Sequence, residues 1–439
     1  IKNGATAVVV DESCDLKALK IPSNVTLIVA KDTREFLALA SANFYGNPSQ
    51  KFKLIGITGT KGKTTTTFMI KEILEKAGKK VGLIGTIATY INGKKIVDSD
   101  RTTPESLELQ RTFADMVKEG VEYVVMEVSS QSLKLHRVDG CHFDLVAFTN
   151  FSEDHISAHE HPDMQDYLQS KLKLFHMCKT GFVNIDDLQG NKIPAMFPDN
   201  DITGYGIDNF GNFLAKDITI TNSYVDFKVK ITDRNERVKV DIPGRFTVYN
   251  ALAAIGVCSL FGAQMDAISG ALGALRVPGR NEVVELNKTF TVIVDYAHTP
   301  ASLEAILSSA KKYTKGRIIC VFGCGGNRDK EKRAMMGEIS GRLADFTIIT
   351  TDNPRDEKPS KIIEDIESGI KQTRGLYKCI ENRRQAIRFA MRIAWKSDVI
   401  IIAGKGHETY QEVENGKKLY FDDKEIVRKI AEEMPDKNI

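Results

Sequence analysis

The sequence GITGTKGKTTTT, residues 56–67, decides the fold. It joins a predicted strand, KLIGITG, to a predicted helix over residues 63–77. The core GxxGK[ST] runs from Gly59 to Thr64, although the first glycine of the longer GxxxxGK[ST] pattern is displaced by one residue, to Gly56. Backbone N–H groups of such a turn cradle phosphates together with the helix N-terminus. The stretch therefore predicts a nucleotide-binding α/β domain, against the alternative of a glycine-rich turn with a surface lysine.

Three residues near this loop have chemistry that suits a nucleotide. Lys63 would reach the terminal phosphates, and the Thr64 hydroxyl would ligate Mg²⁺. Glu127 ends the predicted strand EYVVMEV and could hold Mg²⁺ directly or through water. The alternative for Glu127 is a solvated carboxylate at a strand end.

The stretch FTNFSEDHISAHEHPD, residues 148–163, contains three histidines in an HxxxHxH arrangement. It has neither a nearby cysteine nor the HExxH pattern, so we do not predict zinc. His155 directly follows a predicted strand and is expected to face the nucleotide. His159 and His161 are expected to be loop residues.

The composition is typical of a globular chain with two or three domains, because 439 residues exceed one hydrophobic core. A net charge of +3 permits anionic small ligands, but the chain has no dense basic patch for nucleic acid. It shows no apolar run of membrane-spanning length and no signal peptide. The seven scattered cysteines form no CxxC pair, so we expect reduced thiols and a cytoplasmic protein.

Strands and helices alternate along most of the chain, which predicts mostly parallel sheets covered by helices. Residues 217–243 instead alternate apolar and polar side chains, which predicts an antiparallel subsheet. The chain opens on IKNGATAVVV without an initiator Met, so we expect its first domain to be incomplete.

The order of motifs resembles the Mur ligases. The motifs are GTKGKTTTT, RTTPES, MEVSS, TNFSEDH, YLQSKLKLF, GRFTVYNALAA, VPGRNE, DYAHTP, FGCGGNRDKEKR, DNPR and GKGHE. The resemblance implies an α/β, three-domain architecture. It consists of a partial UDP-substrate domain over residues 1–49, a central P-loop ATPase domain over 50–279 and a Rossmann-like, amino-acid-binding domain over 280–439.

The resemblance also implies an ATP-dependent carboxylate–amine ligase of peptidoglycan biosynthesis. ATP would phosphorylate the D-glutamate carboxylate of UDP-MurNAc-L-Ala-D-Glu, and an amine would displace phosphate from the acyl phosphate. Bringing several anions together requires positive charge and fixed donors. We expect ATP and Mg²⁺ as cofactors, UDP-MurNAc-L-Ala-D-Glu and meso-diaminopimelate as substrates, no nucleic-acid or membrane partner, and a monomer.

Family roles carry over to individual residues by resemblance. The expected catalytic residues are Lys63, Lys171 and His155. The expected metal ligands are Thr64, Glu127, His155 and Lys171, the last as a carbamylated lysine. The expected ATP contacts are Gly59, Thr60, Gly62, Lys63, Thr64, Thr65, Asn250, Arg280, Asp295 and His298. The expected UDP-substrate contacts are Thr102, Thr103, Ser129 and Arg137. From helical spacing alone, Lys171 and Lys173 would both be surface residues, and Lys173 keeps that interpretation.

The loop TTDNPRDEKPS, residues 350–360, follows the predicted strand FTII, and ligands bind at such strand ends. The planar fork of Arg355 would fit a carboxylate. Meso-diaminopimelate differs from L-lysine by an α-amino acid head at its distal end, and DNPR resembles the motif of diaminopimelate-adding members. The expected amino-acid contacts are Arg328, Asp352, Asn353, Arg355, Gly404 and Glu408. Alternatively, Arg355 is a surface residue paired with Asp356 or Glu357.

Other functions stay open from the sequence. They are the same ligase adding L-lysine or another diamino acid, a folylpolyglutamate-type ligase, a P-loop phosphotransferase or NTPase, and an inactive nucleotide-binding scaffold. The phosphotransferase would leave the C-terminal α/β domain and DNPR without a role. The residues Lys63, Thr64, Glu127, His155 and Lys171 are all intact, which argues against the scaffold.

Overall fold

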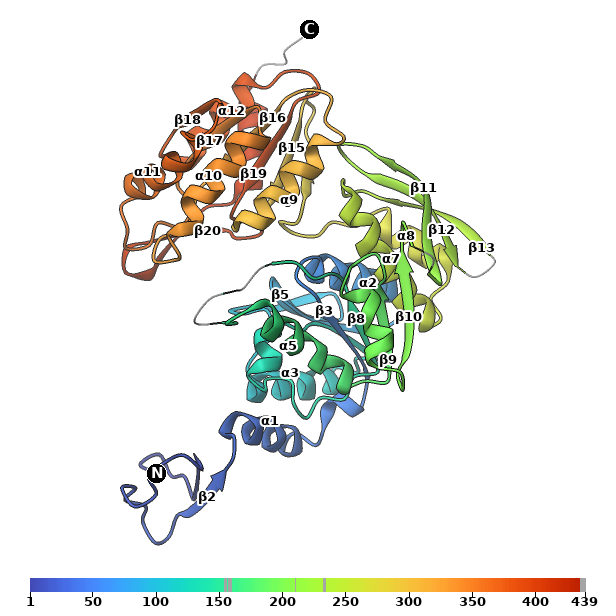
Figure 1. Cartoon of the computed structure of the whole chain (residues 1–439), viewed down its shortest axis with the longest axis vertical. Coiled ribbons are helices and arrows are strands. Elements are labelled where there is room, and N and C mark those ends of the chain that lie inside the picture. Colours follow the sequence, from blue (N-terminus) through green and yellow to red (C-terminus); the bar gives the residue numbers. More distant parts are fainter. Residues whose placement is uncertain (154–155, 157–159, 210, 232–233, 435–439) are drawn as a thin grey trace. The chain divides into compact units, whose positions relative to one another are not determined.

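The computed structural model describes residues 1–153, 156, 160–209, 211–231 and 234–434. The chain divides into two compact units, which Figure 1 traces in the colours of the sequence. Unit 1 comprises Ile1–Asn212 and Ala253–Ala267, and unit 2 comprises Phe213–Leu252 and Ile268–Ile439. None of the helices in the described ranges has both the length and the apolar character needed to span a bilayer.

The main sheet of unit 1 has the strand order β10-β9-β8-β3-β7-β4-β5-β6. Neighbours are parallel from β10 to β4, and β5 and β6 continue the sheet antiparallel. A separate parallel pair is formed by β1 and β2. The bounds are β1 Ala7–Asp11, β2 Thr26–Ala30, β3 Lys53–Thr58, β4 Val81–Ile84, β5 Ala88–Ile91, β6 Lys94–Asp98, β7 Tyr123–Glu127, β8 Leu145–Phe148, β9 Thr180–Asn184 and β10 Asp201–Gly206.

Helices cover both faces of this sheet. Apolar residues of α3 and α5, including Phe113 and Phe175, share one core cluster with alternate residues of the strands. Helix α2 packs against β3, β4 and β7 and buries Ile70 and Ile73. The helix bounds are α1 Thr33–Phe44, α2 Lys63–Lys76, α3 Ser106–Lys118, α4 Ser130–Lys134, α5 Met164–His176, α6 Ile193–Met196, α7 Arg245–Leu260 and α8 Met265–Leu272, and the chain changes unit within α7 and within α8.

Unit 2 contains an antiparallel ribbon and a second sheet. In the ribbon β12 pairs with both β11 and β13, so the antiparallel prediction for residues 217–243 is confirmed. The second sheet has the order β14-β15-β19-β16-β17-β18, parallel except for β14. The bounds are β11 Phe213–Ile220, β12 Val225–Ile231, β13 Arg234–Val240, β14 Glu282–Val284, β15 Thr291–Asp295, β16 Ile318–Phe322, β17 Phe346–Ile349, β18 Tyr377–Cys379, β19 Val399–Ala403, β20 Tyr410–Val413 and β21 Lys417–Tyr420.

Alternate residues of one strand enter different cores of unit 2, as expected for a sheet buried on both faces. On β16, Cys320 and Phe322 pack with helices α9, α10 and α11, whereas Ile319 and Val321 pack with α12 and α13. Because both faces of β16 are buried, its sequence IICVF is apolar at every position. The helix bounds are α9 Pro300–Lys311, α10 Glu331–Leu343, α11 Pro359–Ile370, α12 Arg383–Ile393 and α13 Asp423–Glu433.

Candidate functional site

The predicted phosphate loop of unit 1, residues 59–64, lies at the switch point of the parallel sheet. Strand β3 is flanked by β7 on one side and by β8 on the other, and ligands bind beyond the carboxyl ends of such strands. The loop after β8 braces the loop after β3. Thr60 N donates to Asn150 O at 2.8 Å, and Lys61 N donates to Asn150 Oδ1 at 2.9 Å. A Cβ on Gly59 would lie 2.0 Å from Thr149 Oγ1, so only glycine fits there.

Two lysines meet at the Gly59 carbonyl. Lys63 Nζ donates to Gly59 O at 2.9 Å and to Thr60 O at 2.9 Å. Lys171 Nζ, on α5, also donates to Gly59 O at 2.9 Å, and its amine lies 4.4 Å from the centre of the Tyr167 ring. Lys171 is 1% exposed, so the surface interpretation from helical spacing was wrong for it, whereas Lys173 is exposed as predicted. The structure thus brings a buried amine of α5 to the phosphate loop.

Thr64, in the first turn of α2, and Glu127, at the end of β7, form a hydroxyl–carboxylate pair. Thr64 Oγ1 donates to Glu127 Oε2 at 2.9 Å, and both residues are buried. Thr86 was not predicted. Its N–H and hydroxyl both donate to the Glu127 carboxylate, at 2.8 and 3.0 Å. Carboxylate and hydroxyl oxygens are suitable Mg²⁺ ligands, so the Thr64–Glu127 pair fits the expected metal chemistry.

The remaining part of the expected metal site is not described. His155 lies outside the described residues, as does His159. Within the described ranges, no group of three or more His, Cys, Asp or Glu side chains is arranged to hold a metal ion. His161 is described and fully buried, with Nε2 2.9 Å from Ser130 Oγ and Nδ1 2.6 Å from Asp166 Oδ2. It therefore ties α4 to α5 from its place in the loop.

The four expected UDP-substrate residues lie beside Glu127 in unit 1. Thr103 Oγ1 donates to Glu127 O at 2.9 Å and accepts from Ser129 N at 3.1 Å. The hydroxyl oxygens of Thr102 and Thr86 are 3.1 Å apart. Arg137 forms an ion pair with Glu105 at 3.0 Å, and burial lowers the pKa of its guanidinium. These residues and the phosphate loop therefore share one edge of the sheet.

The expected nucleotide contacts of unit 2 surround the end of β15. Asp295 accepts from Asn281 N at 2.6 Å and from Ala297 N at 2.8 Å, and burial raises the pKa of its carboxyl. The Arg280 guanidinium lies 4.9 Å from the centre of the Tyr296 ring, and His298 Nδ1 lies 2.7 Å from Tyr296 O. Asn250 is buried on α7.

The loop 352–356 follows β17, and its first residue, Asp352, has a carboxylate oxygen without a hydrogen-bond partner in the described structure. Asp352 is 7% exposed, and its Oδ1 accepts from Asn353 N at 2.7 Å. Its Oδ2 is buried without a hydrogen-bond partner in the described structure and faces Gly404, whose φ is +114°. Leaving a buried carboxylate oxygen unpaired costs free energy, so such an atom marks a position for a donor.

A buried lysine organises the neighbouring residues. Lys405 Nζ donates to Asn353 Oδ1 at 2.9 Å and to Glu408 Oε2 at 3.0 Å, and its side chain has 0% exposure. Asn353 Nδ2 also donates to Glu408 Oε2, at 2.8 Å. Lys405 is the lysine of GKGHE, yet the sequence alone did not reveal its burial.

The two predicted arginines differ in their surroundings. Arg328 is exposed on the loop after β16. Arg355 Nε donates to Glu412 Oε2 at 2.8 Å and its Nη1 to Gly326 O at 2.9 Å. The alternative pairing of Arg355 with Asp356 or Glu357 was therefore wrong. Glu357 instead accepts from Arg333, whose hydrogen bonds lower the pKa of the Glu357 carboxyl to about 2.

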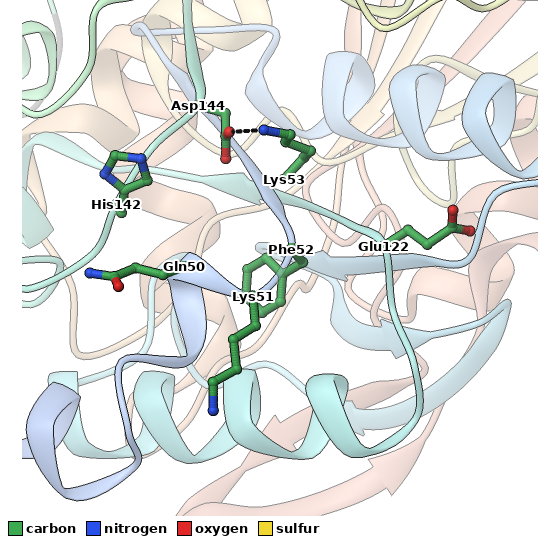
Figure 2. Close-up of a pocket in the computed structure, with 7 residues that line it drawn as sticks. All are labelled: Gln50, Lys51, Phe52, Lys53, Glu122, His142 and Asp144. Atoms are coloured by element: carbon green, nitrogen blue, oxygen red, sulfur yellow. Dashed lines mark hydrogen bonds and ion pairs between the residues drawn. The ribbon is translucent and has the colours of Figure 1, made fainter.

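A shallow hollow lies elsewhere in unit 1. Figure 2 shows it at the amino ends of β3, β7 and β8, where Lys53 Nζ lies 2.7 Å from Asp144 Oδ1. The phosphate loop follows the opposite, carboxyl end of β3. The residues that line the hollow are Gln50, Lys51, Phe52, Lys53, Glu122, His142 and Asp144. None of them belongs to the predicted site.

Comparisons with known proteins show the family to which the chain belongs. Residues 57–258 match the family model described as Mur ligase middle domain, and residues 279–406 match Mur ligase, glutamate ligase domain. A protein of Caldanaerobacter subterraneus subsp. tengcongensis is 50% identical over 434 residues, covering 99% of this chain and 88% of the relative. A Clostridium botulinum protein is 48% identical over 435 residues, covering 98% and 88%. Both are named UDP-N-acetylmuramoyl-L-alanyl-D-glutamate--2,6-diaminopimelate ligase. A solved structure of a ligase of that name has a TM-score of 0.70 at 29% identity, covering 98% of this chain and 88% of its own.

Proposed function

The chain belongs to the Mur ligase family, and from that premise we propose that it adds meso-diaminopimelate to UDP-MurNAc-L-Ala-D-Glu at the expense of ATP. The observation that carries the choice of amino acid is the pair formed by Asp352 and Arg355 on one loop. The unsatisfied Asp352 Oδ2 suits an ammonium, and the Arg355 guanidinium suits a carboxylate. An α-amino acid head carries both an ammonium and a carboxylate. L-lysine has only an ammonium at its distal end.

The phosphate loop supplies the groups that the first step requires. Lys63 and the backbone N–H groups at the start of α2 would hold the ATP phosphates while the D-glutamate carboxylate attacks the γ-phosphorus. Thr64 and Glu127 would hold Mg²⁺. A bound Mg²⁺ would neutralise negative charge on the phosphates. The hydroxyls of Thr102, Thr103 and Ser129, together with Arg137, would fix the UDP-substrate. Thr60, Gly62 and Thr65 complete the proposed nucleotide contacts in this unit.

The loops of unit 2 would orient the incoming amine. With its distal head held by Arg355 and Asp352, the amine at the other end of meso-diaminopimelate attacks the acyl phosphate, and phosphate leaves. Asn353, Gly404 and Glu408 would complete the ammonium site, and Arg328 would add positive charge. Asn250, Arg280, Asp295 and His298 remain proposed ATP contacts, and His155 remains a proposed catalytic residue and metal ligand. The division into domains 1–49, 50–279 and 280–439, a monomeric state and a cytoplasmic location complete the proposal.

Phosphate release tests the proposed function. The purified protein with ATP, Mg²⁺ and UDP-MurNAc-L-Ala-D-Glu is expected to release phosphate when meso-diaminopimelate is added and much less with L-lysine. Preference for L-lysine would overturn the amino-acid assignment. Release that does not depend on the UDP-substrate would favour a phosphotransferase or NTPase.

Carbamylation of Lys171 is part of the proposal. Its burial and its 2.9 Å hydrogen bond to Gly59 O place the amine at the phosphate loop, where a carbamate would add a metal-binding oxygen. A ¹³C carbamate signal is expected after equilibration with ¹³C-bicarbonate. Lys171→Arg should lack the signal, and Lys173→Arg should keep it. An unchanged signal in Lys171→Arg would contradict the assignment.

A further inference from the structure

Glu412 on β20 contacts Arg355 through both its side chain and its backbone. Arg355 Nε donates to Glu412 Oε2 at 2.8 Å, and Arg355 N donates to Glu412 O at 3.1 Å. Arg355 also forms an isolated parallel bridge with Val413. No local pattern in the sequence points to Glu412, because it lies more than fifty positions from DNPR.

The hairpin of β20 and β21 supports most of the loop 352–356. Gln411 Nε2 donates to Asp352 O at 2.9 Å, and Glu412 N donates to Asn353 Oδ1 at 2.9 Å. Asn415 N donates to Asp356 Oδ1 at 3.0 Å. The hairpin therefore supplies donors and acceptors that fix the loop from one side.

The backbone of Arg355 requires such support. Its φ of +51° lies in the left-handed region, which costs a non-glycine residue about 1–2 kcal/mol. Residues in this region persist only where surrounding contacts determine the conformation. Here the contacts with Glu412 O and Val413 determine it.

The Arg355 guanidinium uses two of its five N–H donors in hydrogen bonds to described residues. Its Nε is bound to Glu412 and its Nη1 to Gly326 O, whereas Nη2 donates no hydrogen bond to a described residue. The Arg355 side chain retains 20% exposure. Nη2 and the second N–H of Nη1 thus remain as donors for a planar carboxylate, in an orientation that Glu412 helps to set.

We propose that Glu412 is a positioning residue that presents the Arg355 fork to the distal carboxylate of the incoming diamino acid and thereby sets selectivity. This inference rests on the proposed function, because it needs a diamino acid at Arg355. A guanidinium that rotates freely loses rotational entropy when it binds a carboxylate bidentately. A guanidinium that Glu412 already holds in place loses less on binding. Glu412 does not touch the reacting carboxylate or amine in this scheme.

Steady-state kinetics of Glu412→Ala test the inference. The KM for meso-diaminopimelate is expected to rise about tenfold, as for loss of one charge-assisted hydrogen bond, with kcat and the KM for ATP unchanged. Use of L-lysine should not change, since lysine has no distal carboxylate, so the selectivity ratio should fall by the same factor. Glu412→Gln keeps an acceptor for Nε and should show a smaller rise. Glu414→Gln, at an exposed residue of the same hairpin, is the matched control.

A double-mutant cycle separates positioning from general damage. In an Arg355→Ala background, Glu412→Ala should add no further rise in the KM for meso-diaminopimelate. A full additional rise, an unchanged KM in the single variant, or equal rises for ATP and diaminopimelate would each overturn the inference. If Glu412→Ala fails to fold, the same double-mutant cycle with Glu412→Gln tests the inference. Failure of the proposed function is a separate result, because it would show as absence of diaminopimelate-dependent phosphate release in the unmodified protein.

Discussion

The phosphate loop of unit 1 and the loop 352–356 of unit 2 both follow a parallel strand, but they fix their backbones differently. In the phosphate loop, glycines take the positive φ angles, +139° at Gly59 and +86° at Gly62. In the second loop, Arg355 itself takes the left-handed angle. Glycine adopts such angles without steric cost, whereas arginine does not.

The source of support also differs. Asn150, from the adjacent β8 loop, contacts the phosphate loop through backbone and side-chain atoms. The loop 352–356 is held by Gly326 of the β16 loop, by Lys405 after β19 and by the β20–β21 hairpin. The comparison teaches that one neighbouring loop is enough to brace the phosphate loop, whereas the loop 352–356 needs contacts from three separate segments of unit 2.

The largest expected effect concerns the phosphate loop. Lys63→Ala should lower kcat for phosphate release by about a thousandfold or more, because the cation that stabilises charge on the transferred phosphoryl group is lost. Thermal stability should change little, since the Lys63 side chain is only partly buried. The rates with meso-diaminopimelate and with L-lysine should fall in parallel. Activity within tenfold of the unmodified protein would refute the role of Lys63.

A pair of glycine substitutions should separate the two regions. A Cβ on Gly59 would lie 2.0 Å from Thr149 Oγ1, and one on Gly326 would lie 1.9 Å from Pro354 O, so either loop must shift. Gly59→Ala should raise the KM for ATP and Gly326→Ala the KM for meso-diaminopimelate, each by up to about a hundredfold for 1–3 kcal/mol of overpacking. The comparison would fail if both variants changed the same KM. Gly262→Ala is the control for backbone strain, because its φ is +82°, no atom lies within 4 Å of its Cβ position and it belongs to neither loop, so both KM values should stay unchanged.

The charge-conserving substitution Arg355→Lys should have a smaller effect on the same amino-acid site. Lysine keeps the positive charge but loses the planar fork, so the KM for meso-diaminopimelate should rise by about tenfold while the KM for ATP stays constant. Arg374→Lys, at an exposed arginine of the same unit, should leave both values unchanged. Equal rises in both KM values would argue against direct contact of Arg355 with the amino acid.

The difference between the regions explains what the sequence could predict. The alternation of strands and helices, the antiparallel ribbon and the turn between β3 and α2 follow local patterns, and all three were predicted correctly. The burial of Lys171 was not predicted, because helical spacing places a residue on a face without saying what covers that face, and only the resemblance gave Lys171 a role. Lys405 and Glu412 act through contacts with residues about fifty or more positions away, and no local pattern encodes such contacts.

The smallest expected effect concerns acid stability. Arg333 donates to Glu357 at 2.8 and 2.9 Å and lowers the pKa of that carboxyl from 4.5 to about 2. Because the folded pKa is the lower one, the stabilisation is complete above the unfolded value and is lost as the pH falls towards 2. Glu357→Gln does not titrate, so the gap in apparent melting temperature between it and the unmodified protein should narrow between about pH 6 and about pH 3.

Comparing both proteins at each pH cancels the titration of all other groups, so the narrowing isolates Glu357. Glu364→Gln, which removes an exposed ion pair with Lys361, should leave a small and constant gap. The phosphate loop is braced by the Asn150 amide and backbone, which do not titrate. Acid that protonates Glu357 should therefore weaken its contact with Arg333 in the unmodified protein and leave the support of the phosphate loop unchanged. A gap in melting temperature that stays constant with pH would mean that the Arg333–Glu357 pair makes no pH-dependent contribution to stability.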